Sequence, residues 1–297
     1  MNYNKNWRKI AFLTFVFLFI EVRTLEHNSV DVDVVYVINL DRSPKRLKKM
    51  KEQLNKFDIR FKRLRASDGY NIKIVNKNTG KTEDNKQFHK NCDKSSVYLA
   101  QNGDVTMEYI PSKRNRSLCC GELGCALSHI RIWYDIVKCG YKCAVIFEDD
   151  VLFEDNFPQI LKETLQNAPT DTDILFLDVG VGHSECATPY FVSPGVLLRS
   201  FERLHPDNEY VVRLRDRNNA FGTHAYTVTN TGAAKLIQNS KALRWPIDIH
   251  IMGLRNISQY VARKKMLCAS KEKSEIHMMG RNESIVSNKI VNGGSKQ

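Results

Sequence analysis

Residues 33–57, DVVYVINLDRSPKRLKKMKEQLNKF, decide the fold, because in them a strand pattern runs directly into a helix pattern. Residues 33–40 are β-branched and apolar over the length of one strand. Ser43 and Pro44 follow, a helix-capping residue and a proline at the first helical position. The basic stretch beyond them predicts an amphipathic helix to about Phe57, because its apolar residues recur at helical spacing.

The residues that follow extend this stretch to a strand–helix–strand unit. Residues 60–66 could be a second strand, and Asp68-Gly69 is a turn signal. This order of elements indicates a parallel βαβ unit. Residues 71–117 are polar and rich in Lys, Asn and Ser. We expect them to form a long insert loop that is either functional or disordered.

Later segments repeat the alternation of helix and strand. A broad apolar face predicts a largely buried helix over about 122–138. The apolar run 143–147 predicts a strand that ends in three acids, and 174–177 predicts another strand. Residues 226–229 predict a further strand, and 232–239 a short helix. We therefore expect an α/β fold in a single domain, with a mostly parallel central sheet flanked by helices.

The composition excludes several classes of protein. The chain has 297 residues, 42% of them hydrophobic, which is an ordinary globular balance and rules out a collagen-like, disordered or polytopic membrane protein. Its net charge of +12 indicates an anionic partner: a nucleic acid, a membrane surface or a phosphate-bearing small molecule. Nucleic-acid binding would depend strongly on salt. The sequence holds no recognition-helix or RNA-binding motif, so we expect no nucleic-acid partner.

The N-terminal residues are typical of a targeting segment. Basic residues within 5–9 precede an apolar run over 10–20. As a helix this run spans about 16 Å, half of a ~30 Å hydrocarbon core. We expect a secretory signal or a short membrane anchor at 1–30, with a buried helix or an N-terminal tail as the alternative. The catalytic domain would then cover 31–260, and a basic, polar extension 261–297.

The triplet Glu148-Asp149-Asp150 is the best chemical signal in the chain. It follows a short apolar strand, so its carboxylates lie at the carboxyl edge of the sheet, where open α/β folds bind ligands. Alternate residues of a strand share a face, which places Glu148 and Asp150 on the same side. Such hard oxygen ligands suit Mg²⁺ or Mn²⁺ bridging a diphosphate. The alternative is a polar turn before the next helix. No spaced Cys/His set indicates a zinc site.

Three further titratable residues each have two interpretations. His129 lies on a crowded apolar helix and is either a ligand or a satisfied core histidine. Asp248 follows a proline by two residues, which places it in an extended or turn segment. It could be a general base or a surface acid, and Asp178 at the end of its strand has the same ambiguity.

Several ordered motifs give the chain a resemblance to a known family. They are VINLDRSPKR (37–46) with ASDG (66–69), GELGCALSH (121–129), VIFEDDV (145–151), AYTVTNTGAAKL (225–236) and PIDI (246–249). In this order they resemble glycosyltransferase family 25, which includes lipopolysaccharide sugar transferases and collagen galactosyltransferases. The match covers about residues 33–255.

The resemblance implies a GT-A-like nucleotide-sugar fold, a divalent metal, Mn²⁺ or Mg²⁺, and inverting transfer of a sugar, usually galactose, from a UDP-sugar. It implies that Glu148 and Asp150 bind the metal and that Asp248, or second Asp178, is the catalytic base. The positions that match motifs near the expected donor site are Asn39, Leu40, Arg42, Asp68, Gly69, Glu122, Ser128, His129, Glu148 and Asp149. The acceptor would be a glycan, a lipooligosaccharide or a collagen-like protein.

The resemblance does not decide where in the cell the protein acts or whether it is catalytically active. A signal or anchor predicts the secretory-pathway lumen, or membrane association in a bacterial cell. A catalytically inactive relative that acts as a carbohydrate-binding or adhesion protein is the alternative to an active transferase. The intact acidic triplet argues against that alternative.

Overall fold

The computed structural model describes residues 31–270 apart from 114, 182–200, 204–207 and 215–219. The expected leader at 1–30 and most of the expected extension at 261–297 lie outside these residues. In the described part, no helix is long and apolar enough to cross a membrane. The helices, in chain order, are α2 (Pro44–Lys56), α3 (Phe88–Asn91), α4 (Cys120–Cys139), α5 (Phe157–Gln166), α7 (Asn230–Asn239) and α8 (Ile247–Gly253).

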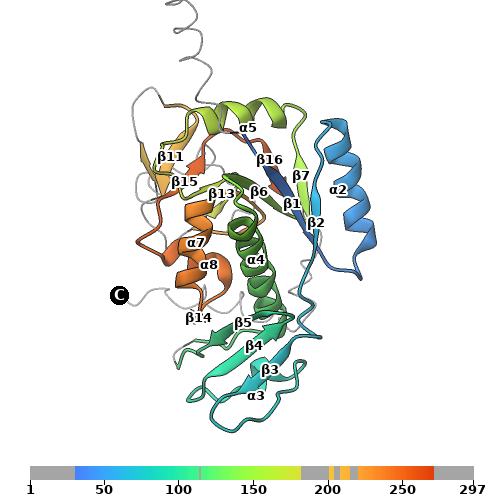
Figure 1. Cartoon of the computed structure of the whole chain (residues 1–297), viewed down its shortest axis with the longest axis vertical. Coiled ribbons are helices and arrows are strands. Elements are labelled where there is room, and N and C mark those ends of the chain that lie inside the picture. Colours follow the sequence, from blue (N-terminus) through green and yellow to red (C-terminus); the bar gives the residue numbers. More distant parts are fainter. Residues whose placement is uncertain (1–30, 114, 182–200, 204–207, 215–219, 271–297) are drawn as a thin grey trace, which may run out of the picture.

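Two main sheets organise the chain into one α/β domain (Figure 1). The large sheet has the order β10 (Phe201–Arg203), β11 (Val211–Leu214), β15 (Gln259–Ala262), β8 (Ile174–Phe176), β13 (Ala225–Thr229), β6 (Cys143–Glu148), β1 (Val34–Asn39) and β2 (Lys62–Arg65). The smaller one has the order β14 (Ala242–Leu243), β5 (Val105–Tyr109), β4 (Tyr98–Asn102) and β3 (Lys73–Asn76). Two further pairs join β12 (Ala220–Phe221) to β9 (Gly180–Val181) and β16 (Leu267–Ala269) to β7 (Val151–Phe153).

The large sheet is mixed, so the expectation of a mostly parallel sheet is wrong. Parallel pairing joins β1 to β2, β1 to β6 and β15 to β8. However, β13 lies between β6 and β8 and is antiparallel to both, and the β10 and β11 edge is antiparallel as well. The pattern of one strand predicts its burial but not the direction from which a distant segment enters the sheet.

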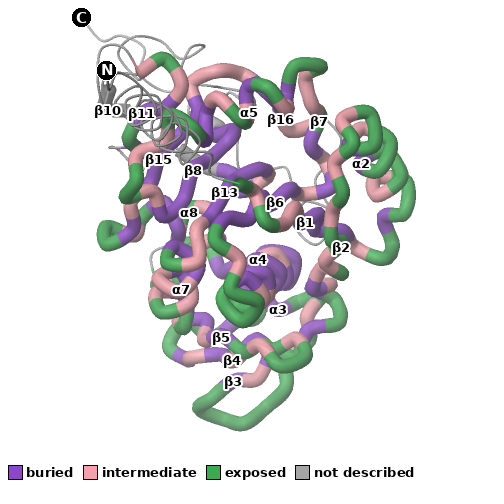
Figure 2. Tube along the Cα trace, turned by 45° about the horizontal axis from the view of Figure 1, so that its top comes forward, coloured by how far each residue is buried: buried purple, intermediate pink, exposed green. Residues whose placement is uncertain are grey.

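The predicted βαβ unit is confirmed. β1 and β2 pair in parallel, with Asn39 opposite Arg65. Between them, α2 begins at Pro44, which fits a residue whose missing N–H would have no partner there. Met50 and Leu54 are buried one turn apart on its inner face. α2 lies along the outside of the domain beside β1 and β7, which leaves its basic face to solvent (Figures 1 and 2).

Helix α4 is the buried centre of the domain, as its apolar faces predict. It runs between the large and the small sheet, and most of its residues are buried (Figures 1 and 2). Cys119 and Glu122 form a capping box at its start. It ends at Gly140, whose backbone is left-handed with φ 69°, a conformation that glycine adopts without steric cost.

The segment 71–117 forms most of the small sheet, and the expectation of a long loop there is wrong. Its strands β3, β4 and β5 bury alternate side chains, among them Ile74, Tyr98 and Tyr109. The two tyrosines pack against Phe88 of α3, whose ring centroid lies 4.9 Å from that of Tyr98 and 5.9 Å from that of Tyr109. The polar residues that suggested a loop occupy the solvent-facing positions between the buried ones.

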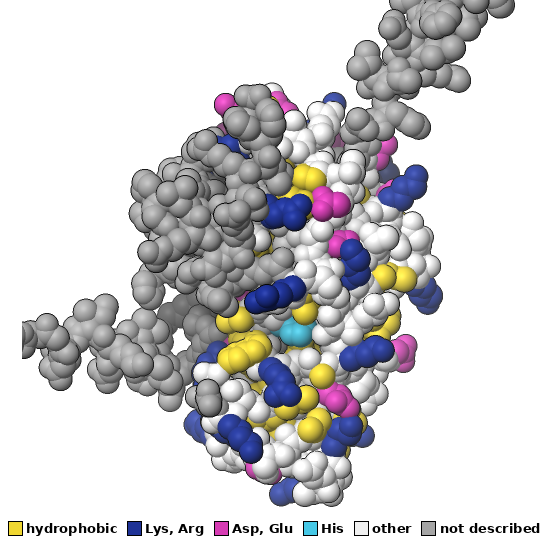
Figure 3. Space-filling view, turned by 90° about the vertical axis from the view of Figure 1, so that its left-hand side faces the viewer, with side chains coloured by type: hydrophobic (Ala, Val, Ile, Leu, Met, Phe, Trp, Pro, Cys, Tyr) yellow, Lys and Arg dark blue, Asp and Glu magenta, His cyan; other side chains and the backbone are white. Residues whose placement is uncertain are grey.

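The Lys and Arg side chains do not gather in one stripe on the face that includes α7 and α8. They are spread over it, with hydrophobic side chains between them (Figure 3). Trp245 and Ile249 are among the large exposed hydrophobic residues of the described chain.

Candidate functional site

A cleft opens at the carboxyl ends of the parallel strands β1 and β6, beside the first turns of α4. In the register of these strands, Ile38 lies opposite Glu148, so the acidic triplet reaches the same edge as the end of β1. The cleft is lined by Ile38, Leu40, Arg46, Ala66, Ser67, Gly69, Gly121, Cys125, Ser128, His129, Glu148, Asp149 and Asp150. The structure thus brings together residues of four separate sequence motifs.

Asp149 lines the cleft and also anchors the triplet. One of its oxygens accepts a hydrogen bond of 2.6 Å from the Asn39 amide, and the other lies 3.0 Å from the Arg46 guanidinium. Burial raises the pKa of Asp149, and the bonds from Asn39 and Arg46 oppose that rise. Asn39 is itself 1% exposed, so it supports the site from behind without lining the cleft.

Glu148 and Asp150 have the donor set that a hard cation requires. Oδ1 of Asp150 is buried without a hydrogen-bond partner. Burial, reinforced by the charge of Glu148, raises the pKa of Asp150 to about 6. A divalent cation would satisfy this oxygen and offset the repulsion between the two carboxylates, so these residues fit the Mn²⁺ or Mg²⁺ expected from the sequence.

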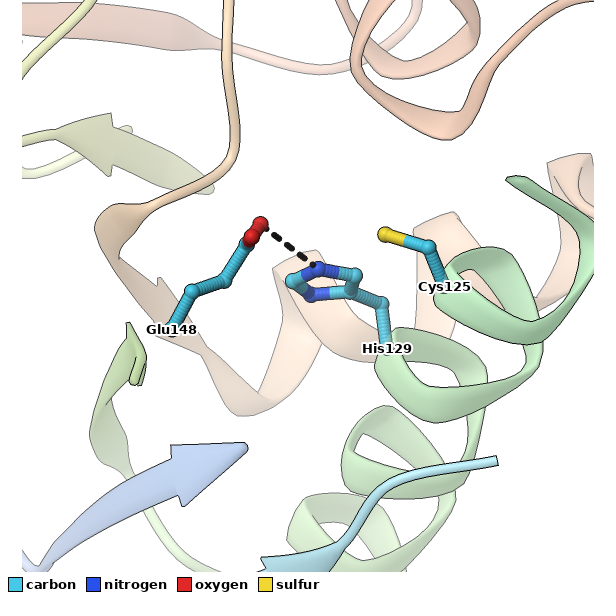
Figure 4. Close-up of side chains that lie close together, drawn as sticks. All are labelled: Cys125, His129 and Glu148. Carbon is cyan, nitrogen blue, oxygen red and sulfur yellow. Dashed lines mark ion pairs between the residues drawn. The ribbon is translucent and has the colours of Figure 1, made fainter. Parts of the chain in front are cut away.

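His129 and Cys125 of α4 approach Glu148 on the inner side of the cleft (Figure 4). His129 Nε2 lies 3.4 Å from Glu148 Oε1, to which the Thr223 hydroxyl also donates at 2.8 Å. Burial acts to raise the pKa of Glu148, but His129 and His224 outweigh it and lower the pKa to about 2. Burial raises the pKa of Cys125 well above its usual value, which keeps the thiol protonated.

The loop 66–69 packs directly against the backbone of α4, because Gly69 and Gly124 place no side chain between them. A Cβ at Gly124 would lie 2.4 Å from the Ser67 carbonyl oxygen, and a Cβ at Gly69 would lie 2.3 Å from the Cys120 carbonyl oxygen. Ser128 Oγ accepts a 2.8 Å hydrogen bond from Ser67 N–H. The predicted Gly69 and Ser128 therefore fix the wall of the cleft.

Besides Asn39, three predicted donor-site residues lie outside the cleft lining. Arg42 and Asp68 form an ion pair that ties the first motif to the second. Glu122 is 2% exposed, and its carboxylate accepts from Cys119 N–H at 3.0 Å and pairs with Arg116 at 2.6 Å. Its structural role is to cap α4 rather than to face the cleft.

The two candidate bases also lie outside the lining. Asp248 is the second residue of α8, and its Oδ2 accepts from Gly222 N–H at 3.1 Å. The next residue, Thr223, bonds to Glu148, so residues 222–223 connect Asp248 to the acidic triplet. Asp178 is 2% exposed, lies 4.0 Å from His224, and has a pKa that burial raises.

Sequence reasoning missed several residues of the site. Arg46 is the last residue of the first motif and Cys125 lies inside the helix motif, so the quoted motifs contain both residues although neither was predicted as a site residue. Thr223 and His224 lie before the strand motif at 225–236 and gave no signal of their own. Only the pairing of β13 with β6 brings them beside Glu148.

Comparison with known proteins agrees with this geometry. The family model described as glycosyltransferase family 25 (LPS biosynthesis protein) matches residues 32–251. The chain is 27% identical over 220 residues to a rat protein named probable inactive glycosyltransferase 25 family member 3, covering 73% of this chain and 32% of that protein. It is 26% identical over 237 residues to zebrafish procollagen galactosyltransferase 1, with 77% and 33% covered. Human procollagen galactosyltransferase 2 is 24% identical over 220 residues, with 73% and 29% covered.

The chain spans about a third of the length of these relatives. The family match, in contrast, covers most of the chain and includes every residue that lines the cleft. The chain therefore belongs to glycosyltransferase family 25.

Proposed function

We propose that the cleft is the donor site of a metal-dependent, inverting hexosyltransferase with a GT-A-like fold. The observation that supports this most is the pair Glu148 and Asp150, which present a partly exposed carboxylate and a buried, unpartnered carboxylate oxygen to one cleft. A bound Mn²⁺ or Mg²⁺ would stabilise the negative charge that develops on a diphosphate leaving group. Asp149 holds the pair in place through Asn39 and Arg46.

The surroundings of the acids suit a nucleoside diphosphate. Gly121 lines the cleft from the first turn of α4, so the partial positive charge of that helix end is directed toward it. Arg46 adds a full positive charge at the same edge, 3.4 Å from Asp150. Ile38, Leu40 and Ala66 give the apolar wall that a base or sugar ring requires.

A carboxylate is needed to remove the proton of the acceptor hydroxyl as its oxygen attacks the anomeric carbon. Asp248 is the first candidate, because its carboxylate is held by the backbone of Gly222 next to the residue that bonds Glu148. Asp178 is the second candidate, because its Oδ2 is buried without a hydrogen-bond partner.

Galactose is the proposed sugar, and UDP-galactose the proposed donor, because two of the relatives are named as procollagen galactosyltransferases. The same names favour a collagen-like acceptor over a glycan or lipooligosaccharide. For such an acceptor we propose a location in the secretory lumen or at a membrane, for which the leader expected at 1–30 would be needed.

The test is a panel of UDP-sugars with purified protein, with and without Mn²⁺, scored for hydrolysis and for transfer to a hydroxylysine peptide or an oligosaccharide. We expect Mn²⁺-dependent turnover that Asp150→Ala reduces by at least about a hundredfold. The control is Asp155→Ala, an exposed acid a few residues away, which should keep wild-type turnover.

No hydrolysis or transfer with any donor would contradict the proposal. It would favour the alternative of an inactive, carbohydrate-binding protein, because several relatives are named as inactive or probably inactive. Glycan binding by the same preparation would then identify that function.

A further inference from the structure

A buried chain of polar side chains leads from the core of the domain to the cleft. Trp133 Nε1 lies 3.0 Å from the Tyr226 hydroxyl oxygen, and that oxygen lies 2.9 Å from His129 Nδ1. On the other side of the ring, His129 Nε2 lies 3.4 Å from Glu148 Oε1. Trp133, Tyr226 and His129 are each 0% exposed, so bulk solvent does not reach their polar atoms.

With a neutral His129 ring, the donors and acceptors of this chain can be matched in only one way. The indole N–H of Trp133 is solely a donor, so the Tyr226 oxygen accepts it. The hydroxyl hydrogen of Tyr226 then needs an acceptor, and His129 Nδ1 is the only one within reach among the described residues. Nδ1 must therefore carry a lone pair, which places the ring hydrogen on Nε2. The other tautomer would bury the Tyr226 hydrogen without a partner, at a cost of about 1–3 kcal/mol.

This tautomer argues against a metal centre formed by Cys125, His129 and Glu148. Their ligand atoms lie within 4.8 Å of one another, as they would in a metal centre with sulfur and nitrogen ligands (Figure 4). A metal ion would need the lone pair of His129 Nε2, and in this tautomer that nitrogen carries a hydrogen. That Nε2–H instead lies near Glu148, with 3.4 Å between Nε2 and Oε1 and no hydrogen bond formed between them.

We propose that Trp133 and Tyr226 are positioning residues that hold His129 as the Nε2–H tautomer, so that His129 and Thr223 fix Oε1 of Glu148 and leave Oε2 for the cation. Thr223 donates to Oε1 at 2.8 Å, and no described residue donates to Oε2. The contact of 3.4 Å from His129 is longer than the roughly 2.7–3.2 Å of a well-formed bond. Contacts in unliganded sites are commonly long and shorten when the site is filled.

The direct test is the ¹⁵N spectrum of the full chain labelled at histidine, with the His129 signals assigned by their loss in His129→Gln. We expect a pyridine-type Nδ1 and a pyrrole-type Nε2 for His129. In Tyr226→Phe the constraint is lost, so the Nδ1 and Nε2 signals should move toward a mixture of tautomers. The Mn²⁺ dissociation constant should rise about tenfold, as for other residues that orient a ligand.

Tyr260→Phe is the matched control. Tyr260 is also a fully buried tyrosine of the large sheet, but its hydroxyl bonds to Asp171 and Arg213, away from the cleft. This variant should lose a similar amount of stability and leave both the His129 spectrum and Mn²⁺ binding unchanged. Equal effects of the two variants on Mn²⁺ would show a general loss of packing and overturn the proposal.

Two other results would overturn it. One is a wild-type spectrum with the hydrogen on Nδ1. The other is a Co²⁺ complex with a thiolate absorption band that disappears in Cys125→Ser, because the cluster would then be a metal centre.

The expected change in Mn²⁺ affinity rests on the proposed function, whereas the tautomer of His129 does not depend on it. Absence of transfer with an Nε2–H histidine would contradict the proposed function alone. Metal-dependent transfer with the opposite tautomer would contradict this inference alone.

Discussion

Gly124→Ala should damage both the stability of the domain and the shape of the cleft. The new Cβ would lie 2.4 Å from the carbonyl oxygen of Ser67, where ordinary contacts begin at 3.4 Å. The loop 66–69 would therefore have to retreat by about 1 Å, because overpacking against backbone is relieved only by movement. That shift would lengthen the hydrogen bond from Ser67 N–H to Ser128, now 2.8 Å.

We expect overpacking and the weakened hydrogen bond together to reduce the free energy of unfolding by about 2–4 kcal/mol. Because Ser67 and Gly69 line the cleft, a 1 Å displacement should also lower turnover by on the order of a hundredfold. Urea denaturation measures the first effect, and initial rates of donor hydrolysis measure the second.

The control for Gly124→Ala is Gly253→Ala at the end of α8. A Cβ at Gly253 would meet nothing within 4 Å, so its stability should stay within about 0.5 kcal/mol of wild type. If both variants unfolded at the same urea concentration and turned over alike, the close approach of the loop to α4 would be refuted. Ser128→Ala, which removes only the hydrogen bond, should give a smaller loss than Gly124→Ala.

Three more predictions follow from the site. Glu122→Ala should lower the free energy of unfolding by about 1–3 kcal/mol, because Cys119 N–H and Arg116 lose their partner, while calorimetry should show unchanged donor affinity. Mn²⁺ binding should weaken about tenfold from pH 7 to pH 5, because Asp150, with its pKa near 6, is mostly ionised at pH 7 and mostly protonated at pH 5. In the same titration, Asp150→Asn should bind Mn²⁺ weakly and without this pH dependence. Asp248→Asn should lower transfer by about 10²–10⁴-fold with little change in donor binding, and a larger loss in Asp178→Asn, measured in the same assay, would move the base to Asp178.

Local patterns predicted the elements near the site with small errors at their ends. The helix expected over 122–138 spans Cys120–Cys139, and the helix expected after Ser43 begins at Pro44. These predictions succeeded because helical periodicity and capping residues act within a few positions along the chain. The same holds for the acidic triplet, which follows its strand and lines a cleft.

Features that depend on distant segments could not be predicted in this way. The direction of β13 is set by its partners β6 and β8, and the sequence of β13 itself is compatible with either direction. The strands of the insert are short and expose many polar side chains. Their alternation of apolar and polar residues is therefore hard to recognise within a segment that is polar throughout. The approach of Glu148 to His129 likewise joins a strand to a helix that comes earlier in the chain.

The small sheet also constrains the order in which the protein can fold. Its edge strand β14 comes from between α7 and α8, yet it pairs in parallel with β5, and Glu108 N–H bonds to the carbonyl of Lys241. A growing polypeptide exposes the open edge of β5 long before the ribosome has delivered residues 241–243. Pairings of such long sequence separation form slowly, and an open strand edge invites association with other chains. We therefore expect nascent chains truncated before residue 241 to need chaperone protection that the completed chain no longer requires.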